Sequence, residues 1–60
     1  MNPQTVANKI ADVRETIRLA YSESDQRGAY SAVEAIVSLL SREMLPAERE
    51  SFYLACGLRG

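Results

Sequence analysis

The sequence contains no histidine and a single cysteine, Cys56, among its 60 residues. Histidine is the commonest general acid–base in enzymes, and a lone thiol with no histidine to activate it is a poor nucleophile. One thiol also cannot form a disulfide within the chain or supply the ligands of a structural zinc site. We therefore expect a protein that is not an enzyme and that binds no metal or cofactor.

The sequence also has no excess of one charge and no long apolar run. Seven basic residues stand against eight acidic ones, for a net charge of −1, so charge gives no argument for binding nucleic acid or an anionic membrane. No apolar run approaches the roughly 20 residues that a membrane-spanning helix needs, and the first residues lack the pattern of a signal peptide. From these absences we predict a cytoplasmic protein with no membrane contact, and they disfavour a nucleic-acid partner.

Apolar residues, by contrast, make up 47% of the chain, which is enough for a packed core. The whole chain, residues 1–60, is predicted to form a single helical domain. A domain of this length buries only about 60% of the surface that its unfolded chain exposes, so its stability is marginal without help. Because disulfides and metals are excluded, the remaining help is close helix packing or a partner chain.

The first predicted helix spans about residues 3–21. Asn2 is a suitable N-cap, and Pro3 takes the first helical position, where its missing N–H costs nothing. Apolar residues then recur at spacings of 4, 3, 4 and 3, which is the seam of a packed helix. These residues are Val6, Ile10, Val13, Ile17 and Ala20.

A second helix is predicted over about residues 25–45, after a polar connection at residues 22–25. Ser22 and Ser24 are both suitable N-caps for it. Its apolar line comprises Tyr30, Val33, Val37, Leu40 and Met44, and it is widened by Ala29, Ile36 and Leu39. A stripe this broad needs more than one neighbour to cover it.

The third predicted helix spans about residues 46–56. Proline forces the preceding residue out of the α region and also suits the first position of a helix, so Pro46 ends one helix and begins the next. Gly57 fits the left-handed position of a Schellman ending, in which Leu58 packs back on Tyr53. The consecutive apolar residues 52–56 surround this short helix, which indicates that it lies between two surfaces.

The predicted fold class is all-α: an antiparallel helical hairpin plus a short third helix, assembled as an oligomeric helical bundle. The short connections favour the hairpin, and the broad stripe of the second helix favours the assembly. The arrangement is similar in architecture to small dimeric helical regulators, although no motif is shared. The residues predicted to form the oligomer or partner interface are Tyr30, Val33, Val37, Leu40, Met44, Phe52, Tyr53 and Leu58.

A cluster of arginines and tyrosines lies around the predicted hairpin turn. Its members are Arg14, Arg18, Tyr21, Arg27 and Tyr30. Arginine forks bind carboxylates and phosphates, and tyrosine rings stack on bases, so the cluster is a candidate site for a small anion or a nucleotide. The alternative is that neighbouring carboxylates neutralise the arginines and that the tyrosines seal the end of the core.

Two further features have competing interpretations. Cys56 is expected to be a small buried apolar residue near a helix end, and its alternative role is a disulfide between two copies or a redox-active thiol. The second and third helices are joined as tightly as in a helix-turn-helix, which leaves a DNA-binding regulator as a weaker alternative. The third helix offers only Arg49 before a run of apolar residues, so we expect it to be buried rather than to read DNA.

The function that these features favour is association. We expect a small oligomeric helical protein, a homodimer or larger, that regulates, adapts or inhibits another protein by binding it. The alternative is a binder of a small anionic or nucleotide ligand that uses the arginine and tyrosine cluster.

Overall fold

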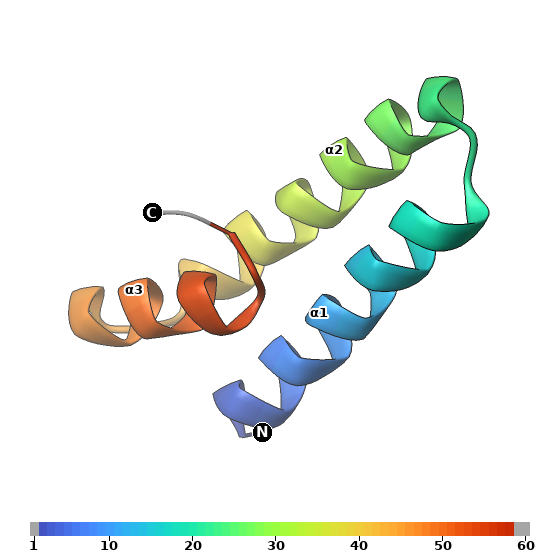
Figure 1. Ribbon diagram of the computed structural model, residues 1–60. Helices are drawn as coiled ribbons and strands as arrows, with labels where there is room; N and C mark the ends of the chain where they lie inside the picture. The colour runs from blue at the N-terminus through green and yellow to red at the C-terminus, as the bar shows by residue number, and fades with distance from the viewer. Residues whose placement is uncertain (1, 59–60) are drawn as a thin grey trace.

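The computed structural model describes residues 2–58 and contains three α-helices (Figure 1). They are α1 (Pro3–Ala20), α2 (Glu23–Ser41) and α3 (Pro46–Ala55). No strand occurs within this range. The all-α class expected from the sequence is confirmed.

Helix α1 begins where the sequence predicts. The Asn2 side chain accepts a hydrogen bond from the Gln4 N–H at 2.9 Å, and Pro3 occupies the first turn. The helix ends at Ala20, one residue earlier than expected, because Tyr21 has extended backbone angles (φ −98°, ψ 145°). The Tyr21 N–H still donates to the Ile17 carbonyl at 3.1 Å, so this end loses little hydrogen bonding.

Helix α2 begins at Glu23, two residues before the predicted start. Ser22 is the N-cap, and its hydroxyl accepts from the Asp25 N–H at 3.4 Å. The carboxylates of Glu23 and Asp25 lie in the first turn, where they interact favourably with the positive end of the helix dipole. The polar connection between α1 and α2 is therefore only residues 21–22, and α2 returns beside α1 in the opposite direction (Figure 1).

Helix α2 ends at Ser41, whereas the sequence predicted residue 45. Residues 42–44 form a tighter turn in which the Glu43 N–H donates to the Leu40 carbonyl at 3.2 Å and the Met44 N–H to the Ser41 carbonyl at 3.0 Å. The turn lets Leu45 reach the extended conformation (φ −68°, ψ 153°) that a residue before proline requires. Pro46 therefore shortens α2 by a full turn, because the chain needs several residues to leave the helix.

Helix α3 starts at Pro46 as predicted and ends at Ala55, one residue early. The Leu45 N–H donates to a Glu48 carboxylate oxygen at 3.1 Å. At the other end Gly57 has φ +84°, and the Leu58 N–H donates to the Tyr53 carbonyl at 2.9 Å. Since the Gly57 N–H also donates to the Leu54 carbonyl at 3.0 Å, this is the Schellman ending expected from the sequence.

The core lies where α3 crosses the open end of the α1–α2 pair (Figure 1). Its buried residues are Ala7, Val37, Phe52 and Cys56. Packed against them are Val6, Ile10, Val33, Leu40, Met44, Tyr53, Ala55 and Leu58. Each helix contributes to this cluster, so α3 packs within its own chain.

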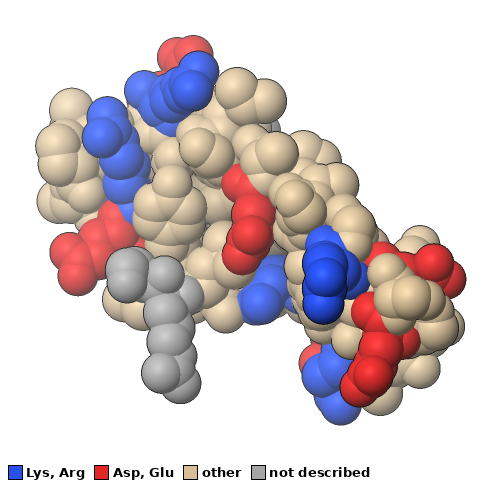
Figure 2. All heavy atoms as spheres, turned by 90° about the horizontal axis from the view of Figure 1, so that it is seen from above, with Lys and Arg blue, Asp and Glu red and all other residues tan. Residues whose placement is uncertain are grey.

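The surface carries charges of both signs. Basic and acidic side chains are interspersed over the face that Figure 2 shows. Within residues 2–58, no helix has the length and apolar character to cross a bilayer, and no three metal-ligating side chains gather together. The remaining features of interest are a cavity beside Arg14 and the apolar side chains that the core leaves exposed.

Candidate functional site

Three of the five predicted cluster residues line one cavity of about 250 Å³. Its lining residues are Ala11, Arg14, Glu15, Arg18, Tyr30, Cys56 and Gly57. Tyr21 and Arg27 do not line it; Tyr21 is half exposed at the end of α1, and Arg27 lies beside Glu23 and Ser24 at another surface hollow. The structure thus divides the cluster that the sequence grouped together.

Arg14 connects α1 to the end of α3. Its Nη1 donates to the Gly57 carbonyl at 2.6 Å and is 3.5 Å from the Cys56 carbonyl oxygen. Its guanidinium carbon lies 5.5 Å from the centre of the Tyr30 ring, and the Tyr30 hydroxyl donates back to the Arg14 carbonyl at 3.4 Å. A cation at the carbonyl end of a helix also interacts favourably with its dipole, so Arg14 acts as a C-terminal cap of α3.

One polar atom of Arg14 is left without a partner. Its Nε is buried and finds no hydrogen-bond acceptor among the atoms that the structure describes. A buried donor without an acceptor costs free energy, so this N–H is the feature of the cavity that would favour an added anion.

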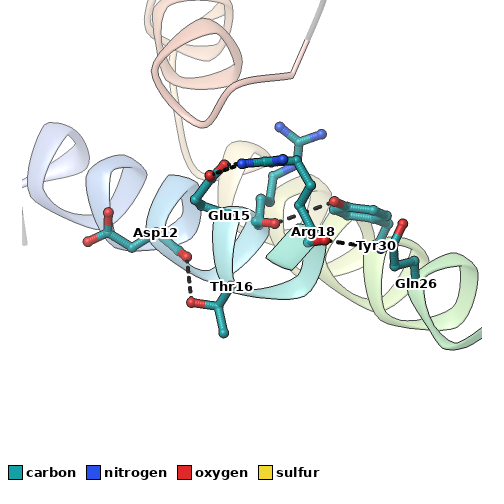
Figure 3. Close-up of polar contacts among 7 residues, drawn as sticks. Asp12, Glu15, Thr16, Arg18, Gln26 and Tyr30 are labelled. Atoms are coloured by element: carbon teal, nitrogen blue, oxygen red, sulfur yellow. Dashed lines mark hydrogen bonds and ion pairs between the residues drawn. The ribbon is translucent and has the colours of Figure 1, made fainter. Parts of the chain in front are cut away.

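Arg18 is paired within its own helix. Its Nε donates to Glu15 Oε2 at 3.1 Å, and its Nη2 contacts Glu15 Oε1 as well (Figure 3). The hydrogen bond from Arg18 lowers the pKa of Glu15 and raises that of Arg18. Both side chains are more than half exposed, at 55% and 59%, so the pair is screened by solvent and contributes little stability.

Cys56 lies in the core beside the same cavity. None of its surface is exposed, and this burial raises the pKa of its thiol, with a smaller opposing effect from the Arg14 charge. A thiol with no exposed surface cannot reach a second folded copy, so the structure gives no support to a disulfide between copies. Arg49 of α3 is also committed within the chain, because its Nε donates to the Ser41 carbonyl at 3.0 Å and the Met44 carbonyl at 3.1 Å.

The residues predicted as an interface lie mostly inside the chain. Val37 and Phe52 are buried. The other six are partly buried, and they are Tyr30, Val33, Leu40, Met44, Tyr53 and Leu58. Tyr53 also places its hydroxyl 2.9 Å from the hydroxyl of buried Ser41. All of these residues except Tyr30 belong to the core cluster or pack against it, so most of their surface is used within one copy. Their role in an interface stays a prediction.

A different set of large apolar side chains is exposed. It comprises Val13, Leu19, Tyr21, Ile36, Leu39, Leu45 and Leu54. Ile36 is 54% exposed and Leu39 is 60% exposed. Leu39 lies on the side of α2 that faces away from Val37, and Ile36 lies on the flank between Val37 and Leu39. Sequence reasoning noted Ile36 and Leu39 only as a widening of the stripe.

We call the line of six residues along this side the outer seam of α2. It consists of Asp25, Gly28, Ala32, Ala35, Leu39 and Arg42, and all six are exposed. The spacing of these residues, 3, 4, 3, 4 and 3, is the signal in the sequence that could have separated them from the core-facing line. The outer seam and its neighbour Ile36 form the candidate functional surface.

Comparison with known proteins identifies no relative. No family model, curated protein or solved structure matches the chain.

Proposed function

We propose that this chain is a homo-oligomeric helical protein that acts by binding another protein, as a regulator, an adaptor or an inhibitor. In this proposal the α1–α2 hairpin is a building unit of a helical bundle. The observation that carries it is the exposure of Ile36 and Leu39, two large apolar side chains of α2 outside its core-facing line. Full burial of an aliphatic side chain of this size contributes about 1.5–3 kcal/mol, so an interface over this side would be stabilised appreciably.

The small core supports the same proposal. Within residues 2–58, the buried hydrophobic residues are Ala7, Ile17, Val37, Phe52 and Cys56. A chain of 60 residues with so few buried side chains has marginal stability alone. Burying a further apolar side in an assembly would add the stability that disulfides or metals supply in other small domains.

Sedimentation of a charged variant tests the oligomer. The Ile36→Glu/Leu39→Glu double variant places two carboxylates on the proposed contact surface and is expected to sediment as a monomer at a concentration where the wild type is oligomeric. The control is Leu19→Glu/Leu54→Glu, which removes two leucines that are 70% and 62% exposed elsewhere. A wild type that stays monomeric and folded at micromolar concentration would refute the oligomer.

Capture from the native host tests the binding of another protein. The wild type and the Leu19→Glu/Leu54→Glu control are expected to retain the same protein, and the Ile36→Glu/Leu39→Glu variant is expected to lose it. Retention of an identical set of proteins by all three would show that binding of the other protein requires neither the outer side of α2 nor the oligomer formed through it.

A second candidate function is the binding of a small anion in the cavity beside Arg14. The buried Arg14 Nε without an acceptor and the Arg18 charge at the rim favour it. The probe is inorganic phosphate, because a ligand at 100 times its dissociation constant adds about 2.7 kcal/mol to stability. We expect phosphate to raise the melting temperature of the wild type and not of Arg14→Gln; no rise in the wild type at millimolar phosphate would exclude this function.

A further inference from the structure

Helix α2 carries two seams on opposite sides. The core-facing residues Val33, Val37 and Leu40 pack within the chain. The outer seam runs from Asp25 to Arg42 at alternating spacings of three and four residues, the repeat by which one helix packs along another. Nothing in residues 2–58 covers this side, since its members are exposed from end to end.

Neither the backbone conformation nor the packing within the chain requires a glycine at position 28 of the outer seam. Gly28 lies within helix α2, and among the residues that the structure describes the positive φ belongs to Gly57 and not to Gly28. No special backbone conformation therefore requires a glycine here. A Cβ built on Gly28 would meet nothing within 4 Å, so no packing inside the chain requires it either. Apart from proline, glycine is the residue least favourable in a helix interior. Close approach of another backbone is a physical reason for a glycine at such a position.

The spacing of the outer seam is the same counted from either end, and its midpoint lies between Val33 and Glu34. From this symmetry we propose that the surface is covered by a second copy of the chain, with the two α2 helices antiparallel about a two-fold axis. The inference rests on the proposed homo-oligomer and assigns its interface. In this register Leu39 of one copy lies over Gly28 of the other, and Ala32 lies opposite Ala35. Large side chains then meet small ones, which is the self-complementarity that a two-fold interface requires.

Charge favours the same register. It places Asp25 opposite Arg42 of the second copy, so the two ends of the seam carry two pairs of opposite charge. Within residues 2–58 the ion pair recorded is Glu15–Arg18, which leaves Asp25 and Arg42 outside it. A parallel dimer would instead bring Asp25 against Asp25, Leu39 against Leu39 and Gly28 against Gly28. Like charges would then meet, and two large side chains would face each other while the two glycines left a gap. Glu43, in the turn after the helix, is the acidic neighbour of Arg42 at this end.

Charge reversal distinguishes the antiparallel dimer from the parallel one. The Asp25→Arg and Arg42→Glu single variants each bring like charges together across an antiparallel interface, and each is expected to raise the dimer dissociation constant about tenfold or more. The Asp25→Arg/Arg42→Glu double variant restores opposite charges and is expected to return close to the wild-type value. Sedimentation equilibrium at low salt measures all four proteins, and failure of the double variant to recover would overturn the antiparallel register.

Substitutions at Gly28 test the close approach. Gly28→Gln introduces a good helix former with bulk beneath Leu39, and it is expected to keep the helical circular-dichroism signal while raising the dimer dissociation constant at least about tenfold. The matched control is Ser38→Gln, an exposed position on another side of α2, which is expected to dimerise like the wild type.

The outcomes separate this inference from the proposed function. A wild-type oligomer that tolerates both Gly28→Gln and the charge reversals would overturn the α2 interface and leave the homo-oligomer standing. A monomeric wild type would overturn both. Loss of dimerisation in Gly28→Gln together with recovery in the double charge variant would establish the interface.

Discussion

Arg14 shows how a residue with an apparent ligand-binding role is used for structure. Its spacing from Arg18 on α1 predicted a shared anion site. In the structure the two side chains have different partners. Arg14 donates a hydrogen bond to the Gly57 carbonyl at the end of α3, and Arg18 donates to the Glu15 carboxylate. Only the Glu15–Arg18 partnership is local in sequence, so the sequence alone could not assign Arg14 to Gly57, 43 positions away.

The role of Arg14 as a cap leads to a stability prediction. Arg14→Gln is expected to lower the free energy of unfolding by about 1.5–3 kcal/mol, the range for hydrogen bonds that involve a charged group. Urea denaturation followed by circular dichroism measures it. Arg27→Gln, at an exposed position of α2, is the control and is expected to change stability by less than about 0.5 kcal/mol. Equal effects of the two substitutions would contradict the capping role.

The buried thiol of Cys56 predicts a dependence of stability on alkaline pH. Burial raises its pKa above the usual 9.0, so the folded state holds the thiol proton more tightly than the unfolded state does. Stability is therefore expected to be full below about pH 9 and to fall as the pH rises through the higher pKa of the folded protein.

The comparison with Cys56→Ala isolates this effect. All other ionisable groups are the same in both proteins, so their contributions cancel in the difference. The difference in unfolding free energy between wild type and Cys56→Ala is expected to be constant from pH 7 to 8 and to shrink above pH 9. A difference independent of pH up to 10.5 would show that the thiol is not held protonated.

At the scale of helices, each C-terminus is capped by a side chain from another helix. Gln26 of α2 donates to the Arg18 carbonyl at the end of α1 at 3.3 Å (Figure 3). It also donates to the Tyr21 carbonyl at 3.0 Å. Arg49 of α3 caps the end of α2, and Arg14 of α1 caps the end of α3. Each of the three helices therefore receives at its C-terminal end a hydrogen-bond donor from another helix, which satisfies carbonyls that have no partner within a helix.

These caps explain which helix boundaries the sequence could predict. The starts of α1 and α3 follow from Asn2, Pro3 and Pro46, and the end of α3 follows from Gly57, because each signal acts within a few residues. The end of α2 was wrong by four residues, because the chain needs a turn before the extended Leu45 that Pro46 requires, and Arg49 of the next helix stabilises this turn at residues 42–44. Its start was wrong by two, because two serines offered equivalent local caps.

Removing the Arg49 cap is predicted to loosen the junction between α2 and α3. Arg49→Met keeps the apolar stem and removes both hydrogen bonds, so we expect a loss of about 1–3 kcal/mol in unfolding free energy and faster amide hydrogen exchange at residues 42–46. Lys9→Met, at an exposed position of α1, is the control. Unchanged exchange at the junction in Arg49→Met would show that the turn holds itself without Arg49.

At the scale of the molecule, the position of α3 decides which side of α2 is inside. The sequence shows a stripe on α2 too broad for one neighbour, and from it alone we assigned Val33, Val37 and Leu40 to an interface. In the structure α3 and α1 together cover those residues and leave Ile36 and Leu39 in solvent. Which residues of the stripe are covered depends on packing between segments far apart in sequence. The residues of the stripe could therefore be predicted from the sequence, but not which of them are buried and which are exposed.

The central position of Phe52 predicts that the three helices unfold together. Phe52 is 3% exposed and belongs to the cluster formed by all three helices. Phe→Ala substitutions in cores cost about 3–5 kcal/mol, and a chain of 60 residues has a total stability of only about 3–9 kcal/mol. Phe52→Ala is therefore expected to abolish most of the helical circular-dichroism signal at 25 °C, because isolated helices of 10–19 residues are marginal in water.

Leu54→Ala is the matched control for Phe52→Ala. Leu54 is two residues further along the same helix and 62% exposed, so its truncation is expected to leave the helical signal and the midpoint of urea unfolding nearly unchanged. Both variants are measured at a protein concentration below that at which the wild type associates, so that burial between copies does not stabilise either one. If Phe52→Ala retained the helical signal of α1 and α2, those two helices would be stable without α3. The core would then have to be divided into an α1–α2 unit and a separately attached third helix.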